Sequence, residues 1–434
     1  MSLQTSSPTL TSAHPDTEKL DEVSTWQFRE DLALRYGTPI YAYDLDRVKE
    51  RYDSLRSLFP EKANPQLMYS FKANPLPSVA GELEHCGACA DLTSPGEIRA
   101  AMEAGFDLSK ALYGGPGKNE VEFLQAIGAG IRQFSVESEV DLRALSLAAE
   151  RAGQLVRALI RINPAEPPKA KLAMSGVASQ FGFEESYLRE NGKSVLQLKS
   201  DLVTVEGVHI YWGTQIGDPE ALLACFSKTI SIAEELSESM GFHLAVINFG
   251  GGFPWPYAHE GEGPDLSSLR EELQQLFDDS SAAAKASWWF ESGRYLVGSS
   301  GSLITRVMDL KTSKDDKQYL IVDTGIHHLG GMSGLGRIPR FSIELLVPEE
   351  RKDAEEITVD VVGQLCTPLD CIGKKIKIPK PEVGDLLVIP NVGAYGMTAS
   401  VCSFLSRPAP AEVAHRADRV IAAHRLRTGH ESIV

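Results

Sequence analysis

Eight short runs of β-branched and aromatic residues alternate with amphipathic stretches, and this alternation is the feature that most constrains the fold. In stretches such as SEVDLRALSLAAERAG and PEALLACFSKTISIAEELSESM, apolar residues recur at every third or fourth position. Eight strands that each adjoin a helix, over about 250 residues, predict an α/β fold with a TIM-like (β/α)8 barrel. The predicted strands are QLMYSFKA (66–73), ACADLTS (88–94), KALYGG (110–115), QFSVES (133–138), VRALIRINP (156–164), VEGVHIYWG (205–213), HLAVINFGG (243–251) and SWWFESGR (287–294).

The pattern changes after residue 296, where strand-like runs follow one another with few helical stretches between them. This change predicts a second, mostly β domain at the C-terminal end. We assign residues 46–296 to the barrel, residues 21–45 and 297–434 to the β domain, and residues 1–20 to a disordered polar tail. The predicted strands of the β domain are SLITRVMDL, QYLIVDTG, FSIELLVP, EITVDVVGQL and DLLVIPNV.

The composition is that of a globular protein and limits the partners that the chain can have. Hydrophobic residues make up 43% of the 434 residues, and the net charge of −16 argues against nucleic acid or an anionic membrane surface as the main partner. No apolar stretch reaches the roughly 18 residues of a membrane span, and the N-terminal residues lack the features of a signal peptide. We therefore expect a cytoplasmic protein.

The cysteines and histidines give no clear metal motif. Six cysteines are too few for a disulfide scaffold, and a cytoplasmic setting would keep them reduced. Cys86 and Cys89 form a C-x-x-C pair without a second pair at zinc-ribbon spacing, so packing is favoured over zinc. His327 and His328 are adjacent and belong to no known ligand motif. We expect no metal site.

Lys72 ends the first predicted strand, in YSFKAN, and a turn-forming Asn-Pro pair follows it. An amine whose charged form is disfavoured by partial burial can form a Schiff base with an aldehyde, and barrel strand ends are where catalytic residues gather. The alternative is a solvated lysine that opens a loop. Polar residues or glycines also stand at other strand ends, namely Arg161, Asn163, His209, Tyr211, Gly250, Gly251, Gly252, Glu291, Ser292, Gly293 and Arg294.

The three consecutive glycines at 250–252 free the backbone to direct several N–H groups at one anion. Arg294 can bind the same anion through two guanidinium N–H groups. A loose turn is the alternative. Combined with an amine nucleophile at the same barrel mouth, the glycines predict a phosphate-bearing aldehyde, pyridoxal 5′-phosphate. A competing phosphate loop at residues 114–119 lacks the first glycine and the final Ser or Thr of a P-loop.

Between residues 40 and 413 the chain resembles the fold-type III pyridoxal-phosphate decarboxylases, the group of diaminopimelate, ornithine and arginine decarboxylases. The resemblance implies an alanine-racemase-like barrel. Within the group, the C-terminal motifs are most similar to a diaminopimelate-decarboxylase-like branch that includes a decarboxylase of glutamyl groups held on an acyl carrier protein and decarboxylases of exosortase gene clusters. Nine motifs carry the resemblance in order: YSFKAN, DLTSPGE, ALIRINP, SQFGF, GVHIYWGTQ, INFGGGF, ESGR, GQLCTPLD and GAYGM.

The resemblance implies catalytic roles for Lys72, Glu291 and Cys366. Lys72 would hold the cofactor as a Schiff base, and Glu291 would keep the pyridine nitrogen protonated. Cys366, supplied by the partner subunit of a head-to-tail homodimer with two shared active sites, would direct reprotonation of the carbanion. Taken alone, Cys366 fits a buried structural cysteine better. The implied cofactor-binding residues are Lys72, Arg161, His209, Tyr211, Thr214, Gly250, Gly251, Gly252, Glu291, Gly293, Arg294 and Tyr395.

Three residues depart from the better-known members of this family. Tyr211 stands where a histidine stacks on the cofactor. Thr324 stands where ornithine decarboxylases have an aspartate for the distal ammonium, and Thr367 where diaminopimelate decarboxylases have a glutamate. A basic amino acid would therefore bury a charge without its partner. The departures predict an acidic, neutral or carrier-protein-bound amino acid as the substrate of a specialised biosynthetic enzyme.

The predicted substrate contacts are Arg337, Arg340, Thr367 and Asp370. The two arginines could meet an anionic or carrier-linked group, and their alternative is a pair of solvated loop cations. Other functions remain as alternatives: a meso-diaminopimelate decarboxylase of lysine biosynthesis, an amino-acid racemase, or an inactive binding homologue. A racemase of this fold places an arginine at the pyridine nitrogen, so Glu291 argues against it. An inactive homologue typically loses cofactor residues, which are present here.

Overall fold

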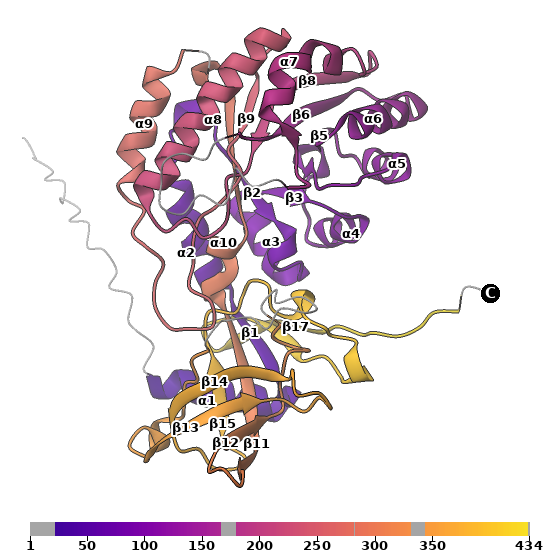
Figure 1. Ribbon diagram of the computed structural model, residues 1–434. Helices are drawn as coiled ribbons and strands as arrows, with labels where there is room; N and C mark the ends of the chain where they lie inside the picture. The colour runs from indigo at the N-terminus through magenta and orange to yellow at the C-terminus, as the bar shows by residue number, and fades with distance from the viewer. Residues whose placement is uncertain (1–21, 166–178, 282, 331–342, 433–434) are drawn as a thin grey trace, which may run out of the picture.

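The structure, a computed structural model, describes residues 22–165, 179–281, 283–330 and 343–432. It contains two sheets, a closed barrel of parallel strands and a second, mixed sheet, and Figure 1 shows them one above the other. The N-terminal helix α1 (Glu22–Tyr36) lies with the second sheet, next to β1 (Ile40–Asp44). The predicted barrel with an added mostly β part is thus confirmed.

Eight parallel strands form the barrel, and pairing of β10 with β2 and of β5 with β6 closes it. Each of the eight predicted runs overlaps one of these strands, and all but the run at 205–213, where β8 begins two residues earlier, contain the whole strand. A further two-residue strand, β7 (Phe183–Glu184), extends the sheet beside β6. The barrel strands are β2 (Gln66–Ser70), β3 (Cys89–Leu92), β4 (Leu112–Tyr113), β5 (Gln133–Val136), β6 (Val156–Asn163), β8 (Val203–Ile210), β9 (Val246–Asn248) and β10 (Ser287–Ser292).

Helices cover the outside of the barrel (Figure 1). The sequence sets their ends locally, as in α6, where the Ser138 hydroxyl accepts a hydrogen bond from Asp141 N at 3.1 Å and Gly153 ends the helix with φ 60°. The remaining helices around the barrel are α2 (Leu45–Arg56), α3 (Pro77–Cys86), α4 (Pro95–Glu103), α5 (Glu120–Gly128), α7 (Glu185–Leu196), α8 (Pro219–Met240), α9 (Leu269–Asp279) and α10 (Arg294–Val297).

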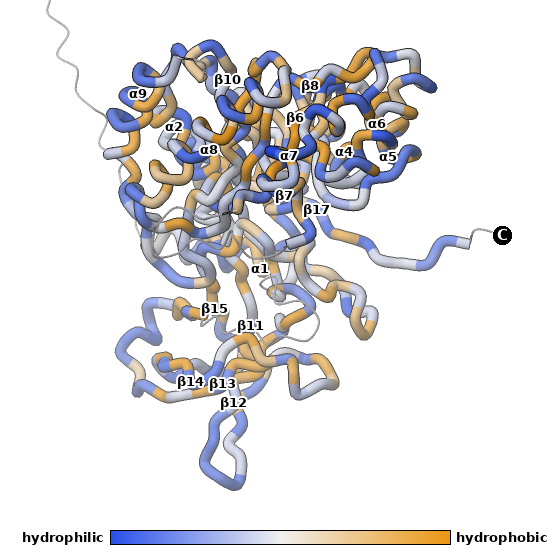
Figure 2. Tube along the Cα trace, turned by 45° about the horizontal axis from the view of Figure 1, so that its top comes forward, coloured by the Kyte–Doolittle hydropathy of each residue, from blue (hydrophilic) through white to orange (hydrophobic). Residues whose placement is uncertain are grey.

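Alternate residues of the barrel strands serve two separate cores. Trp288 and Phe290 of β10 pack in the main cluster, which includes apolar residues of the surrounding helices, whereas Trp289 belongs to a smaller cluster. Figure 2 shows the apolar strands enclosed by more polar helices. The smaller cluster takes residues from five strands and consists of Met68, Leu112, Leu159, Val246 and Trp289.

The second sheet joins β1 to strands that follow residue 300. Its order is β14-β13-β12-β11-β1-β16-β17, with β15 paired to β11. Four of its predicted runs contain strands, but FSIELLVP does not within its described residues, where Leu346 makes only an isolated bridge to Val388. The domain boundaries stay a prediction. The strands after β1 are β11 (Gly301–Thr312), β12 (Gln318–Val322), β13 (Glu356–Val362), β14 (Cys371–Pro379), β15 (Leu386–Ile389), β16 (Ala411–Arg416) and β17 (Arg419–Arg425).

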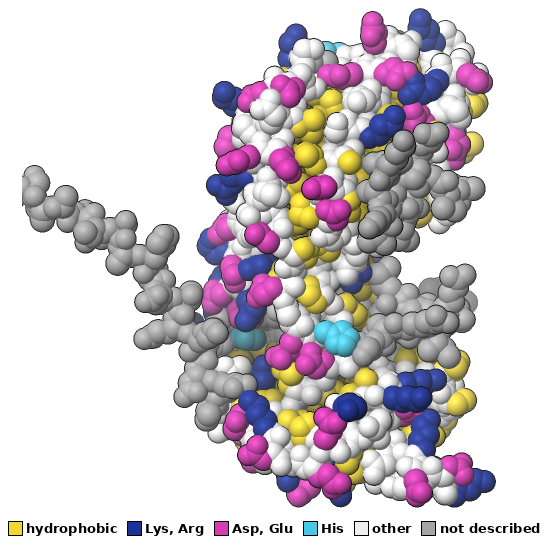
Figure 3. Space-filling model, turned by 60° about the vertical axis from the view of Figure 1, so that its left-hand side comes forward, with side chains coloured by type: hydrophobic (Ala, Val, Ile, Leu, Met, Phe, Trp, Pro, Cys, Tyr) yellow, Lys and Arg dark blue, Asp and Glu magenta, His cyan; other side chains and the backbone are white. Residues whose placement is uncertain are grey.

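The face shown in Figure 3 carries acidic and basic side chains interspersed over both parts of the molecule. Within the described ranges, no helix is both long and apolar enough to cross a membrane. All six cysteines are free thiols, and burial raises the pKa of Cys86 to about 11.

Candidate active site

A pocket at the carboxyl ends of the barrel strands gathers most of the predicted site residues. Strand alternation explains why the pocket lies here. Glu291 follows Trp289 by two residues in β10, and Ser70 follows Met68 by two residues in β2, so both point into the barrel on the same face as the smaller apolar cluster. Each polar side chain therefore lies directly above that cluster. The lining residues come from the ends of four strands and from one later segment. They are Ser70, Lys72, Tyr211, Thr214, Gly251, Gly252, Phe253, Glu291, Ser292, Gly293, Arg294 and Tyr395.

Lys72 lies in a single 3-10 turn (Phe71–Ala73) that directly follows β2. The turn is tied to the second sheet's chain segment, because Tyr395 N donates to Ala73 O at 2.7 Å. The Lys72 side chain is accessible from the pocket, although protein surrounds it on most sides. Burial lowers the pKa of its amine, but the carboxylates of Asp91 and Glu291 outweigh burial and leave the pKa raised. Burial thus disfavours the ammonium as predicted, but the two carboxylates, which the prediction did not include, reverse the net effect.

The Glu291 carboxylate is held from the barrel interior. Asn248 Nδ2 donates to its Oε1 at 2.9 Å, and His209 Nε2 lies 3.2 Å from the same oxygen. His209 Nδ1 meets the Ser135 hydroxyl at 2.9 Å. Burial, with a smaller effect of the Arg161 charge, holds the pKa of His209 well below its usual value, so the imidazole is neutral. A neutral histidine therefore lies beside the Glu291 carboxyl group.

Asp91 is a second buried carboxylate near the pocket that sequence analysis missed. It lies in β3 and its Oδ2 accepts a hydrogen bond from the Ser70 hydroxyl at 2.8 Å. Burial and the Glu291 carboxylate raise the pKa of Asp91 to about 7, against the opposing charge of Lys72. A polar residue within the otherwise apolar run ACADL was the available signal. Asn248, inside the run AVINF, carried the same signal.

Arg161 lies in β6 but is not among the residues that line the pocket. Its Nη1 forms an ion pair with Glu137 Oε1 at 2.7 Å, and Glu137 Oε2 accepts from Gly182 N at 3.1 Å. The Arg161 guanidinium carbon lies 4.8 Å from the centre of the Phe181 ring. The structure therefore places Arg161 in a partly buried pair behind the pocket, and its predicted contact with a cofactor ring stays a prediction.

The glycine run and Arg294 together fit a phosphate group. A Cβ atom at Gly250 would lie 2.7 Å from Ile210 O, and one at Gly251 would lie 2.6 Å from Glu291 O, so the close approach of these backbones requires glycine. Arg294 Nε is buried and has no hydrogen-bond partner among the described residues. Its guanidinium carbon lies 4.7 Å from the Tyr395 ring. An unpaired guanidinium nitrogen beside an open glycine backbone is suited to an anion with several oxygens.

The other predicted residues lie elsewhere in the chain. Cys366 is exposed and Thr367 half-buried in the connection between β13 and β14, and neither lines the pocket as far as the structure describes it. Asp370 is buried at the end of the same connection, and Thr324 is buried beside His328. Arg337 and Arg340 lie outside the described residues.

The two competing motifs, the phosphate-loop-like segment and the histidine pair, lie outside the described lining of the pocket. In the failed phosphate loop, Lys118 Nζ pairs with Asp141 Oδ2 at 2.6 Å, and both side chains are buried. Neither His327 ring nitrogen has a hydrogen-bond partner among the described residues. No group of three potential metal-ligating side chains occurs in that part of the chain.

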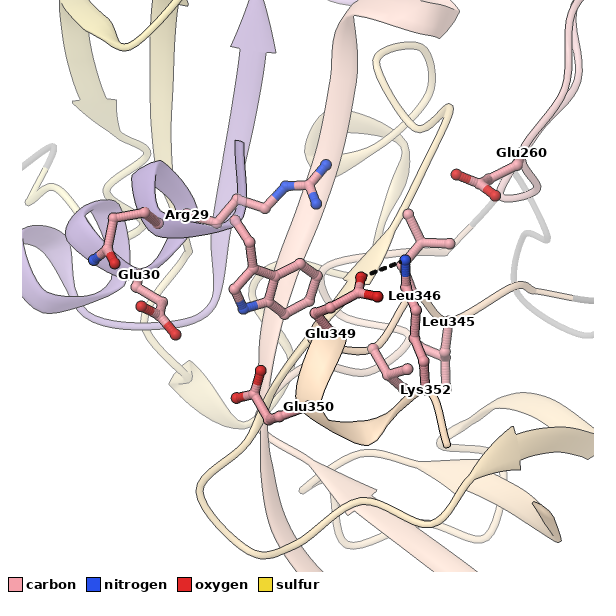
Figure 4. Close-up of a pocket in the computed structure, with 11 residues that line it drawn as sticks. Arg29, Glu30, Glu260, Leu345, Leu346, Glu349, Glu350 and Lys352 are labelled. Carbon is pink, nitrogen blue, oxygen red and sulfur yellow. Dashed lines mark ion pairs between the residues drawn. The ribbon is translucent and has the colours of Figure 1, made fainter. Parts of the chain in front are cut away.

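A second hollow lies outside the barrel, between α1 and the segment around residues 345–352 (Figure 4). Lys352 Nζ pairs there with Glu349 Oε2 at 2.6 Å, and the Arg29 guanidinium carbon lies 5.4 Å from the Trp26 ring centre. The described lining of this hollow contains none of the predicted site residues. The pocket at the barrel mouth is therefore the candidate active site.

Comparison with known proteins agrees with this site. The family described as "Pyridoxal-dependent decarboxylase, pyridoxal binding domain" matches residues 45–298. A protein of Niallia circulans named L-glutamyl-(BtrI acyl-carrier protein) decarboxylase is 32% identical over 395 residues, which is 89% of this chain and 90% of that protein. Diaminopimelate decarboxylase of Methanothermobacter thermautotrophicus is 33% identical over 396 residues, which is 90% of this chain and 89% of that protein.

Solved structures show the same fold. Diaminopimelate decarboxylase from Helicobacter pylori, complexed with L-lysine, aligns with a TM-score of 0.78 and 28% identity, covering 90% of this chain and 94% of that one. The enzyme of the same name from M. jannaschii, also with L-lysine, gives a TM-score of 0.80 and 25% identity, with 90% of each chain covered.

Proposed function

The chain belongs to the pyridoxal-dependent decarboxylases, and we propose that it removes the α-carboxylate of an amino acid whose side chain bears no distal ammonium group. The family assignment makes it an amino-acid decarboxylase that uses pyridoxal 5′-phosphate. The substrate class is our proposal. A specialised acidic or neutral amino acid, free or bound to a carrier protein, fits it, and cytoplasmic location stays a prediction.

The pocket residues supply a role for each part of the cofactor. We infer that Lys72 is its covalent attachment point and that Arg294, Thr214 and the glycines at 250–252 hold the phosphate. Glu291, fixed by Asn248 at 2.9 Å, would keep a proton on the pyridine nitrogen. When bound, pyridoxal 5′-phosphate supplies a sink for the electron pair left on the α-carbon as carbon dioxide departs.

The observation that carries the substrate proposal is the charge around the connection that bears Cys366. Asp370 is the one acidic residue between Gly363 and Cys371, and both of its oxygens already accept backbone N–H groups, from Ile326 at 2.9 Å and Leu365 at 2.7 Å. A distal ammonium would therefore meet on this connection only a carboxylate that is already bonded to the backbone.

A nearby cation strengthens that argument. Arg407 donates to the Gln364 side chain at 2.7 Å and to its carbonyl at 3.2 Å, and forms no ion pair with a carboxylate among the described residues. A partly buried guanidinium outside any salt bridge of the described residues disfavours an ammonium and favours an acidic or uncharged group. Its charge also acts on Asp370, where it opposes the rise in pKa that burial causes. Thr324 and Thr367, which stand in place of carboxylates, also disfavour a substrate with a distal ammonium.

Cys366 reaches a reaction centre only if a second copy of the chain contributes. The thiol is exposed and absent from the described lining of its own pocket. Large apolar side chains are also exposed in the connections joined by the Arg407–Gln364 contact, with Leu369 58%, Phe404 46% and Leu405 49% accessible. These features support a homodimer in which Cys366 enters the partner subunit's active site.

The second candidate is meso-diaminopimelate decarboxylation. The names of several relatives favour it, and two of them are 32% and 33% identical, against 32% for the carrier-protein enzyme. The occupied Asp370 carboxylate and the positive charge of Arg407 argue against it. Release of carbon dioxide by the pyridoxal-phosphate-loaded protein should be compared for glutamate, a glutamyl carrier thioester, meso-diaminopimelate, lysine and ornithine, with Lys72→Ala as the blank. Turnover of the basic amino acids alone would overturn the substrate proposal.

A further inference from the structure

The connection from Gly363 to Asp370, called here the thiol loop, is held by hydrogen bonds along its own length. It joins β13 to β14, and Gly363 N donates to Asp370 O at 3.1 Å. Inside it, Thr367 N donates to Leu365 O at 2.8 Å and Asp370 N donates to Thr367 O at 3.1 Å. These contacts fold the thiol loop into consecutive tight turns.

The Asp370 carboxylate fixes the base of the thiol loop to a neighbouring segment. One oxygen accepts from Leu365 N within the loop, and the other accepts from Ile326 N, which follows β12. The slot around it admits only glycine: a Cβ at Gly325 would lie 2.2 Å from Oδ1, and one at Gly363 would lie 2.4 Å from Oδ2. The carboxylate therefore joins two chain segments, and each of its oxygens already accepts a backbone N–H group.

Arg407 fixes the other side of the thiol loop. Its two donated bonds hold both the side chain and the carbonyl of Gln364, two residues before Cys366. Leu405 and Ser406, directly before it, have φ values of 56° and 52°, a left-handed backbone that costs free energy in residues other than glycine. Such a backbone persists where tertiary contacts impose it, and the Arg407 contacts are of this kind.

Cys366 is the exception within this well-bonded loop. Its thiol is exposed and makes no hydrogen bond to any residue that the structure describes. We propose that Asp370 and Arg407 are positioning residues, which fix the thiol loop in one conformation so that Cys366 is presented to the partner subunit's active site. This inference rests on the proposed role of Cys366. It assigns Asp370 to the loop and not to the substrate contact predicted from sequence.

The test uses Asp370→Asn in the cofactor-loaded dimer, because an amide places a donor against one of the two N–H groups. Asp360→Asn is the matched control: Asp360 is also a buried carboxylate of this sheet, accepts Lys375 N at 2.9 Å and pairs with Lys317 at 2.6 Å. Amide hydrogen exchange across residues 363–370 should accelerate about tenfold or more in Asp370→Asn only. We expect kcat to fall about 100-fold, with KM near wild type and thermal stability similar to the control.

Two further variants keep the test informative if Asp370→Asn does not fold. Gln364→Ala removes one acceptor of Arg407 and should lower kcat, whereas Gln364→Glu keeps the acceptor and should restore it. Because the proposed effect acts through the thiol, adding Asp370→Asn or Gln364→Ala to a Cys366→Ala protein should lower kcat little further.

Unchanged exchange in the thiol loop, or a full additional loss of kcat in the Cys366→Ala background, would overturn the inference. Full activity of Cys366→Ala on its own would instead refute the proposed role of Cys366, while hydrogen exchange would still report whether Asp370 holds the loop.

Discussion

Glu412 gives a direct physical test of the packing between β1 and β16, two neighbouring strands of the second sheet. It lies in β16, is 7% exposed, and its Oε1 accepts a hydrogen bond from the Tyr43 hydroxyl of β1 at 3.2 Å. Burial raises the pKa of Glu412 to about 7, and the Tyr43 hydrogen bond opposes this only in part. The carboxyl is therefore partly protonated near neutral pH in the folded protein.

The sign of the effect on stability follows from the raised pKa. The folded protein binds the proton more tightly than the unfolded chain, so this contribution is fully present below about pH 4.5 and is lost as the pH rises through about 7. A pKa of about 7 against an ordinary 4.5 corresponds to about 3 kcal/mol in the free energy of unfolding. Glu412→Gln cannot ionise and should not lose that stability.

Urea titrations of wild type and Glu412→Gln at about pH 5 and about pH 8 measure the effect, because all other titrating groups cancel in the comparison. Between these pH values wild type should lose most of about 3 kcal/mol relative to the variant. Glu356→Gln, an exposed glutamate of β13 paired with Lys377, is the control and should follow wild type. Parallel pH dependence in wild type and Glu412→Gln would refute the reasoning.

Three further predictions concern the candidate active site. Wild type should retain pyridoxal 5′-phosphate through borohydride reduction and denaturation, whereas Lys72→Ala should lose it; trapping of the cofactor in Lys72→Ala would contradict the attachment point. Arg294→Met removes a charge-assisted bond to phosphate and should weaken cofactor binding about 10- to 100-fold in an absorbance titration of the apo protein, and unchanged affinity would refute its role. Mixing inactive Lys72→Ala and Cys366→Ala subunits should restore about a quarter of wild-type activity if each site draws on both subunits. No recovery after demonstrated subunit exchange would indicate that each site is built from one chain.

The barrel was predictable because each strand is a separate short apolar run next to a helical pattern. The inward positions of Asp91 and Asn248 were not, because barrel strands are buried on both faces and lose the alternation that marks a single buried face. The direction of the Lys72 pKa shift was likewise not predictable from the sequence. Burial could be expected from its position after an apolar run, but the opposing carboxylates come from β3 and β10, which only the closed barrel brings together.

The second sheet was harder to predict. FSIELLVP is as apolar as a strand, yet in its described part only Leu346 bridges to another strand. In contrast, β14 (CIGKKIKIP) carries lysines and was missed, although it pairs with β13 along much of its length. The sequence also suggested Asp370 as a substrate contact, because composition cannot reveal that both carboxylate oxygens are occupied by backbone N–H groups.

The ratio of kcat/KM for a glutamyl carrier thioester or free acidic amino acid to kcat/KM for meso-diaminopimelate tests the central claim most directly. With the Asp370 carboxylate bonded to the backbone and the Arg407 guanidinium outside any salt bridge of the described residues, the ratio should strongly favour the substrate that lacks a distal ammonium. An unpaired buried charge costs about 2–5 kcal/mol, which corresponds to a ratio of at least about 30. A kcat/KM for meso-diaminopimelate at or above about 10⁴ M⁻¹s⁻¹, with no preference for the acidic substrates, would contradict the account.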